Sequence, residues 1–154
     1  MGALAVQKDQ RYQDAFRPHL QLLPGLANFL PRGHQRGVPM GIGSAAIPFN
    51  IDFVLNNLNL RPYFPVVISA DDVTRSKPHP ETFLKAAAQL GIPASDCLIR
   101  GRAQGRGSRP QRGYVGRGAH HPHIALEFAD LPNVLHCAPD FTAPFMTTLL
   151  PAAF

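Results

Sequence analysis

The chain has 154 residues, of which 45% are hydrophobic, and this is enough for one globular domain with a sizeable core. No apolar run approaches the ~20 residues of a membrane span, and the amino terminus lacks the basic start and long apolar core of a secretory signal, so we expect no membrane segment and a cytoplasmic location. The formal net charge of +5 would favour a nucleic-acid-binding protein, but six arginines between residues 100 and 118 account for more than all of it.

The amino-terminal part of the chain is predicted to be helical. Residues 8–23 have the composition of a polar helix that breaks before Pro18, because the residue that precedes a proline avoids the α region. A second helix is predicted over residues 25–35 from its apolar spacing, although Pro31 weakens that pattern.

From residue 38 onward, strands are predicted to alternate with helices. The predicted elements are strands over residues 38–44 and 65–70, helices over 48–59 and 80–90, and a third strand that begins at residue 96. This alternation predicts an α/β fold with a three-layer, Rossmann-like parallel sheet and right-handed crossovers. Ligands in such folds lie at the carboxyl ends of the strands, which is where Ser44 and the loop with Lys77 fall.

Two short motifs follow the first two predicted strands. Gly41-Ile-Gly-Ser44 ends the first strand, and residues 69–83 include Arg-Ser-Lys-Pro-His-Pro, which places Lys77 on a tight loop between a strand and a helix. Together they resemble two of the four signature motifs of the haloacid dehalogenase superfamily, in the phosphoglycolate phosphatase and β-phosphoglucomutase-like branch of its subfamily I. The resemblance covers most of residues 8–99 and 127–142.

The resemblance implies a phosphate site for a small phosphorylated metabolite such as a sugar phosphate. In the family, an aspartate nucleophile, a second aspartate and a magnesium ion act beside a hydroxyl and a lysine that bind the phosphoryl oxygens. Ser44 matches the hydroxyl, the amide of Ala45 is a second donor, and Lys77 matches the lysine. Ser44 and Lys77 are therefore the candidate catalytic residues, and together with Ala45 they are the candidate phosphate ligands. A serine after a strand is otherwise most often a helix cap.

Two departures from the family pattern limit this expectation. The Asp-x-Asp-Gly-Thr motif would precede residue 1, so we expect an amino-terminally truncated chain in which residues 1–23 are a cap remnant and residues 24–154 a partial core without its central nucleophile strand. The Glu-Asp magnesium ligands would lie near residues 100–102, where the chain has arginine and glycine. We therefore expect no Mg²⁺ binding and no phosphatase or phosphomutase activity, and we expect self-association through unpaired strand edges.

Three other polar features of the sequence are candidate sites. Asp71 and Asp72 have the composition of a metal-binding pair, but their place on the loop before the lysine favours a loop cap. His120-His-Pro-His123 has the composition of a metal tract. His79, next to the lysine motif, is a candidate for shaping the loop, and we assign no metal ligand to this chain.

Residues 100–124 differ in character from the rest of the chain. Translated one nucleotide later, the codons from Arg100 onward can spell Glu-Asp-Ala-x-Arg-Gly-Val-Glu-Ala-Ala-Arg-Ser-Ala-Gly-Met, which resembles the fourth family motif and its helix. Our hypothesis is that these residues are out-of-frame translation between two compensating frameshifts and are irregular or disordered. The alternative is a natural arginine-glycine loop in a noncatalytic nucleic-acid-binding protein that uses residues 100–118, whose RNA binding would weaken steeply with salt.

Genomic sequencing through the codons for this segment tests the frameshift hypothesis. We expect a missing or extra base near codon 100 and a compensating change by about codon 124. A clean reading frame throughout, with no missing or extra base, would contradict the hypothesis.

Overall fold

The computed structural model describes residues 3–76, 79–102, 113–117, 134–138, 141–142 and 144–150. The helices are α1 (Ala3–Phe16), α2 (Leu26–Gln35), α3 (Pro48–Asn57), α4 (Glu81–Leu90) and α5 (Pro144–Thr148). The strands are β1 (Gly41–Gly43), β2 (Val66–Ile68), β3 (Leu98–Arg102), β4 (Gly113–Arg117) and β5 (Val134–Ala138). Short 3-10 turns occur at Arg17–His19, Arg61–Tyr63, Ala70–Asp72 and Ala94–Asp96.

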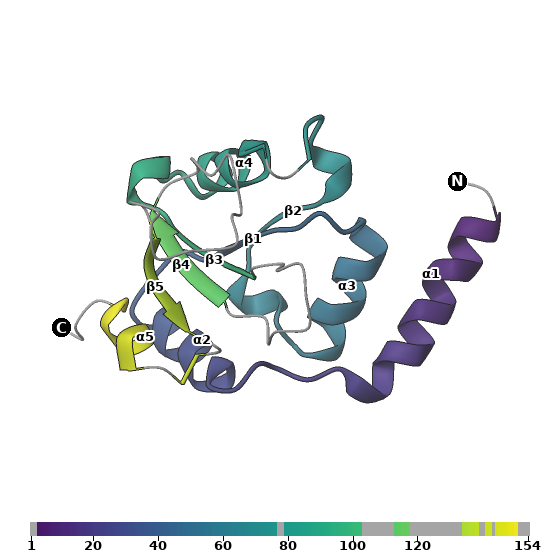
Figure 1. Cartoon of the computed structure of the whole chain (residues 1–154), viewed down its shortest axis with the longest axis horizontal. Helices are drawn as coiled ribbons and strands as arrows, with labels where there is room; N and C mark the ends of the chain where they lie inside the picture. The colour runs from purple at the N-terminus through teal and green to yellow at the C-terminus, as the bar shows by residue number, and fades with distance from the viewer. Residues whose placement is uncertain are drawn as a thin grey trace.

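Strands β1 and β2 form a parallel pair between two layers of helices. Figure 1 shows α4 on one side of the pair and α2 and α3 on the other. Successive side chains of a strand point to opposite faces, so Val66 and Ile68 pack with Ala86 of α4, while Ile42 and Val67 pack on the opposite side. The buried residues of that opposite cluster are Leu30, Ile51, Leu55 and Leu60. The predicted layered α/β arrangement is therefore confirmed for this part of the chain.

Most of the elements predicted between residues 25 and 90 are confirmed. Helices α2, α3 and α4 match the predicted segments closely, and β1 and β2 lie inside the predicted strands but are only three residues long each. The break before Pro18 is also confirmed, because α1 ends at Phe16 and the proline lies in a 3-10 turn. The helix itself differs from the prediction in that it begins at Ala3.

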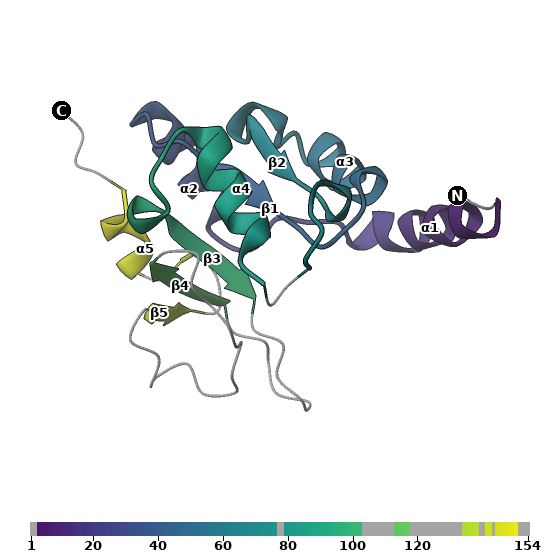
Figure 2. The ribbon, with the colours of Figure 1, turned by 90° about the horizontal axis from the view of Figure 1, so that it is seen from above.

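The prediction that β3 joins the parallel sheet is wrong. Strand β3 pairs antiparallel with β4, and β4 pairs antiparallel with β5, as a second sheet (Figure 2). The length of the next connection explains why β3 and β4 are antiparallel, since residues 103–112 are too few for the crossover of a dozen or more residues that a parallel neighbour requires. Residues 100–102 lie in β3 and residues 113–117 in β4, so the expectation that residues 100–124 are irregular is wrong for both stretches. For the other residues between 103 and 124, which lie outside the described ranges, it stays a prediction.

Polar side chains of α1 and of the turn that follows it bind α3. The Gln13 side chain, only 5% exposed, donates hydrogen bonds to the Phe49 carbonyl and to Asn50 Oδ1, both at 3.2 Å. The Arg17 guanidinium donates to Asn57 Oδ1 at 3.1 Å. In Figure 2, α1 extends away from the layered part of the molecule, and the assignment of residues 1–23 to a cap remnant stays a prediction.

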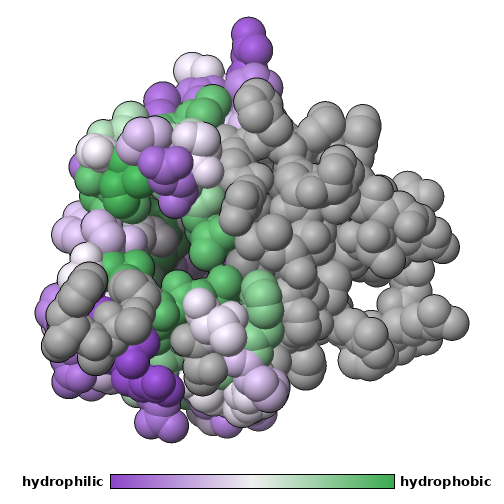
Figure 3. Space-filling model, turned by 90° about the vertical axis from the view of Figure 1, so that its left-hand side faces the viewer, coloured by the Kyte–Doolittle hydropathy of each residue, from purple (hydrophilic) through white to green (hydrophobic). Residues whose placement is uncertain are grey.

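Several large hydrophobic side chains are exposed in the described part of the chain. They are Tyr12, Phe16, Leu23, Phe49, Leu84 and Leu98. Figure 3 shows hydrophobic surface between hydrophilic patches on one face of the molecule. None of the described helices is both long enough and apolar enough to cross a membrane. Self-association through strand edges stays a prediction.

The start of α2 packs against Phe141, which lies near the other end of the chain. The Phe141 amide donates to the Pro24 carbonyl at 3.0 Å, and the Phe141 ring lies 5.1 Å from the ring of Phe29. Gly25 has a φ of +81°, and a Cβ at this position would lie 2.6 Å from the carbonyl carbon of Phe141. Only glycine fits here, because both the backbone conformation and the space exclude a side chain.

We expect Gly25→Ala to destabilise the fold more than Gly37→Ala does. Gly37 also has a positive φ, of +68°, but a Cβ there would meet nothing within 4 Å, so this control isolates the backbone strain of about 1–2 kcal/mol. The clash at Gly25 should add roughly 1–3 kcal/mol. Urea unfolding of both variants measures the difference, and equal loss of stability would show that the contact with Phe141 is not formed.

Candidate functional site

The candidate site lies where the chain leaves β1 and β2. Two backbone hydrogen bonds continue the pairing past the strand ends, from the Ser44 amide to the Ile68 carbonyl at 2.8 Å and from the Ala70 amide to the Ala46 carbonyl at 2.9 Å. They hold the loop after β1 beside the loop after β2. The two motifs singled out in the sequence therefore meet at the carboxyl end of the parallel pair, where α/β folds bind ligands.

Ser44 and Ala45 keep hydrogen-bond donors available at this edge. The Ser44 Oγ accepts a hydrogen bond from the Ala46 amide at 3.1 Å, which leaves the hydroxyl proton free to donate. The Ala45 amide makes no hydrogen bond with any of the described residues. Helix α3 begins at Pro48 and its N-cap position is Ile47, so Ser44 is not the cap of that helix.

Helix α4 approaches β1 closely at Gly43. A Cβ at Gly43 would lie 2.9 Å from Thr82 Cγ2 and 3.1 Å from the ring of Phe83, which is tighter than a side chain tolerates. Thr82 itself is 1% exposed. The first turn of α4 therefore packs directly on the end of β1, and it brings the loop that precedes α4 next to Ser44.

A small cavity of about 110 Å³ opens between these loops. It is lined by Ser44, Ala45, Ala70, Val73, Thr74, Ser76 and Thr82. Cavities that hold drug-sized ligands measure roughly 300–1,000 Å³, so this one suits a group the size of a phosphoryl rather than a whole metabolite. The structure thus brings together the predicted Ser44 and Ala45, whereas Lys77 lies outside the described residues.

Sequence reasoning missed the hydroxyl groups of Thr74, Ser76 and Thr82 in this cavity lining. Their signal in the sequence is their position, because all three lie within five residues of Lys77 on the same loop and helix start. The residues that flank Lys77 and Pro78 are hydrogen-bonded to each other, since the His79 amide donates to the Ser76 carbonyl at 3.1 Å.

Asp72 caps the turn that follows β2. The Ser69 amide and hydroxyl both donate to Asp72 Oδ2, at 2.7 and 2.6 Å, and the Asp71 amide donates to Ser69 Oγ at 3.3 Å. These bonds from Ser69, first from its side chain and then from its backbone, lower the pKa of Asp72. The prediction that this aspartate pair forms a loop cap is confirmed for Asp72.

The Glu81 carboxylate binds the next part of the same loop. Its Oε1 accepts the Thr74 amide at 3.1 Å, and its Oε2 accepts the Arg75 amide at 2.9 Å and the Thr74 hydroxyl at 3.1 Å. Lys85 Nζ lies 2.9 Å from Glu81 Oε1 and donates to the Asp72 carbonyl at 2.7 Å. The bond from Lys85 and then that from the Thr74 amide lower the pKa of Glu81 to about 2.

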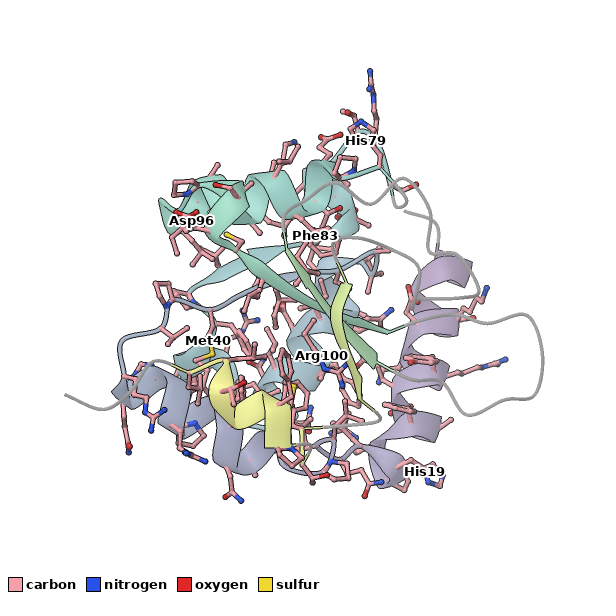
Figure 4. The ribbon with its side chains drawn as sticks, turned by 60° about the vertical axis from the view of Figure 1, so that its left-hand side comes forward. His19, Met40, His79, Phe83, Asp96 and Arg100 are labelled. Atoms are coloured by element: carbon pink, nitrogen blue, oxygen red, sulfur yellow. The ribbon has the colours of Figure 1, made fainter. Side chains whose placement is uncertain are left out.

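His79 stands at the outer end of α4, where Figure 4 shows it beside the loop. Its Nδ1 accepts the Glu81 amide at 3.2 Å, and its Nε2 lies 3.2 Å from Arg75 Nη1. A neutral imidazole has one acceptor nitrogen, so only one of these contacts is a hydrogen bond at a time. Because Nδ1 faces a backbone amide, the tautomer protonated at Nε2 fits, and the guanidinium then only lies against the ring.

The described residues do not fit a magnesium site. A magnesium ion requires oxygen ligands, usually carboxylates, and no group of three His, Cys, Asp or Glu side chains with metal-binding geometry occurs in the described ranges. Where the family pattern expects the acidic ligands, Arg100 lies with its guanidinium carbon 5.0 Å from the centre of the Phe141 ring. The histidine tract at 120–123 lies outside the described residues.

Comparison with known proteins identifies the family. A family model described as haloacid dehalogenase-like hydrolase matches residues 2–101. The chain belongs to the haloacid dehalogenase-like hydrolase family. The resemblance drawn from the Ser44 and Lys77 motifs is thereby confirmed.

Several curated proteins resemble this haloacid dehalogenase-like chain. An uncharacterized protein of Haemophilus influenzae is 36% identical over 84 residues, which cover 51% of this chain and 42% of that protein. The fructose-1-phosphate phosphatase YqaB of Escherichia coli K12 is 32% identical over 97 residues, covering 63% and 50% of the two chains. The phosphoglycolate phosphatase of Salmonella typhimurium is 34% identical over 94 residues, covering 60% and 37%. The chain therefore spans half or less of the length of these relatives.

A crystal structure from Thermotoga maritima, of a protein assigned as a β-phosphoglucomutase, has a similar fold. The TM-score is 0.51 at 21% sequence identity, and the match covers 62% of this chain and 46% of the other. At this identity the likeness concerns the fold alone. It supports a partial haloacid dehalogenase-like fold, in agreement with the small parallel pair β1–β2.

The cap formed by Asp72 predicts a pH-dependent contribution to stability. The pKa of Asp72 is lowered in the folded chain, so its contribution is complete above the ordinary value of 3.8 and is lost as the pH falls through the folded pKa. We expect Asp72→Ala to lower the urea midpoint at pH 7 and to have a smaller effect at pH 3. Asp71→Ala is the matched control, because the Asp71 carboxylate binds no other described residue. Equal midpoints for the two variants at pH 7 would contradict the role of Asp72.

Proposed function

We propose that this chain carries the phosphate-binding part of a haloacid dehalogenase-like phosphohydrolase or phosphomutase for a small phosphorylated metabolite. The observation that carries the proposal is the cavity at the carboxyl ends of β1 and β2, into which the loops of both motifs open. Among the described contacts, neither the Ser44 hydroxyl nor the Ala45 amide donates a hydrogen bond, so both can donate to a ligand in this cavity.

The three proposed ligands have distinct roles. A phosphoryl group undergoing transfer carries negative charge on its equatorial oxygens, and fixed donors and cations stabilise that charge. The Ser44 hydroxyl and the Ala45 amide would each donate to one phosphoryl oxygen, held in place by the backbone bond from Ser44 to Ile68. The ammonium of Lys77, which follows the cavity-lining Ser76 directly in the chain, would neutralise the charge.

The relatives support the substrate class. Two of them are named for the dephosphorylation of fructose 1-phosphate and of phosphoglycolate, and both compounds pair a phosphoryl group with a small polar body. A cavity of about 110 Å³ holds the phosphoryl group only, so the rest of the substrate would lie outside it. We propose binding rather than turnover for this chain, because its 154 residues contain no Asp-x-Asp pair that matches the family nucleophile. No step is assigned to magnesium.

Calorimetric titration of the full chain with inorganic phosphate tests the proposal. We expect Ser44→Ala and Lys77→Ala each to weaken binding about tenfold or more, because a hydrogen bond to a charged group contributes about 1.5–3 kcal/mol. The control variants are Ser95→Ala and Lys8→Ala, which remove the same groups from places that do not line the cavity. Absence of binding by the unaltered chain, or equal affinities for all variants, would refute the proposal.

A further inference from the structure

We propose that Glu81 is the positioning residue of this site, and that its carboxylate holds the loop carrying Lys77 in register with α4. The proposal rests on the proposed phosphate site and names the group that would align its cation. Neither the motifs nor the relatives assign a role to Glu81.

Glu81 binds two consecutive backbone amides, and this makes it more than a surface ion-pair partner. The amides of Thr74 and Arg75 are received by different oxygens of the one carboxylate, at 3.1 and 2.9 Å. Two bonds to neighbouring peptide groups fix both the distance and the orientation of the loop. These amides lie three and two residues before Lys77.

The carboxylate itself has a rigid support. Glu81 is the first residue of α4, and its neighbour Thr82 is buried against Gly43 at the end of β1. The Glu81 side chain is 16% exposed, and Lys85, one helical turn later, lies 2.9 Å from its Oε1. Through Glu81 and Thr82, the loop is therefore attached to the end of β1, the strand that precedes Ser44. In this way α4 would align the Lys77 loop with Ser44.

The other hydrogen bonds of the loop do not involve the backbone amides of Thr74 and Arg75, which bind Glu81. Asp72 fixes the beginning of the loop through Ser69, and the bond from the His79 amide to the Ser76 carbonyl closes its end. Among the described contacts, the amides of Thr74 and Arg75 have no acceptor other than Glu81. Without the carboxylate, the backbone of Thr74 and Arg75 would lose its hydrogen bonds to α4, although Val73 would still pack on the cluster that includes Ala86 of that helix.

A simpler role for Glu81 would be a favourable charge at the amino terminus of α4. Glu81→Asp separates the two roles. It retains the negative charge in the first helical turn, but it is one methylene shorter and cannot reach both amides from the same backbone position. Glu81→Ala removes both functions. Asp52→Asn is the matched control, because Asp52 is an exposed carboxylate paired with Arg61 away from the cavity.

The experiment measures amide hydrogen exchange at Thr74 and Arg75 by NMR, and inorganic phosphate affinity by calorimetry, in the full chain and the three variants. We expect Glu81→Asp and Glu81→Ala to accelerate exchange at both amides and to weaken phosphate binding by about tenfold, since charge-assisted bonds are lost. Asp52→Asn should change neither. If Glu81→Asp exchanges at the same rate as the unaltered chain, the positioning role is overturned.

The two measurements keep this proposal separate from the proposed function. If the unaltered chain binds no phosphate, the phosphate site fails, and exchange alone decides whether Glu81 holds the loop. If phosphate binds equally well to Glu81→Asp while exchange is accelerated, the loop contact exists but does not position the site, and the proposal is overturned. If Glu81→Ala does not fold, the conservative Glu81→Asp variant decides the question, with its urea midpoint confirming that the fold is intact.

Discussion

The candidate site depends on two backbone hydrogen bonds that continue the β1–β2 pairing beyond the strands themselves. Each strand has only three residues, so the ladder alone would leave the following loops free to diverge. The bonds from Ser44 to Ile68 and from Ala70 to Ala46 prevent this and hold the two loops side by side. The absence of a side chain at Gly43 then lets α4 close over that edge. Hydroxyls, amides and the lysine loop meet because of this geometry, and a helix displaced from Gly43 would open the cavity.

The loop after β2 is held by ionised carboxylates and, at Val73, by apolar packing on the cluster of Val66, Ile68 and Ala86. Residues 71–76 are mostly exposed, so hydrophobic burial contributes little to their order, and their backbone amides need acceptors. Asp72 and Glu81 supply those acceptors from the two ends of the loop. Both groups have a lowered pKa, so they stay charged at more acidic pH than an ordinary carboxylate does. Their oxygens accept hydrogen bonds from the loop backbone, and Lys85 neutralises part of the charge at Glu81.

Local signals in the sequence were sufficient for α2 to α4 and for the positions of Ser44 and Ala45. Pro80 before α4 and Gly91, with its φ of +71° after it, mark that helix without any tertiary information. The role of Glu81 was not predictable in this way, because an acid in a first helical turn is ordinary and its partners become visible only when the loop is placed. The pairing of β3 was predicted wrongly for a related reason. The apolar run that starts at residue 96 identifies the strand β3, but its own residues do not identify its partner. That partner, β4, lies in the segment that follows.

That following segment links the second sheet to the reading-frame hypothesis. The family model ends at residue 101, next to residue 100, where the hypothesis places the first frame change. In the restored frame the permitted codons include Val-Glu-Ala-Ala-Arg-Ser-Ala over the next residues, all tolerated or favoured in helices. A helix there would take up these residues and move the next strand later in the chain, and a connection through a helix is the crossover that parallel neighbours require. The antiparallel β3–β4 pair then follows from the printed residues 103–112, which have no helical apolar pattern and are too short to cross the sheet. The same out-of-frame segment would thus account both for the arginines at the positions of the expected acidic ligands and for the antiparallel pairing of β3 with β4.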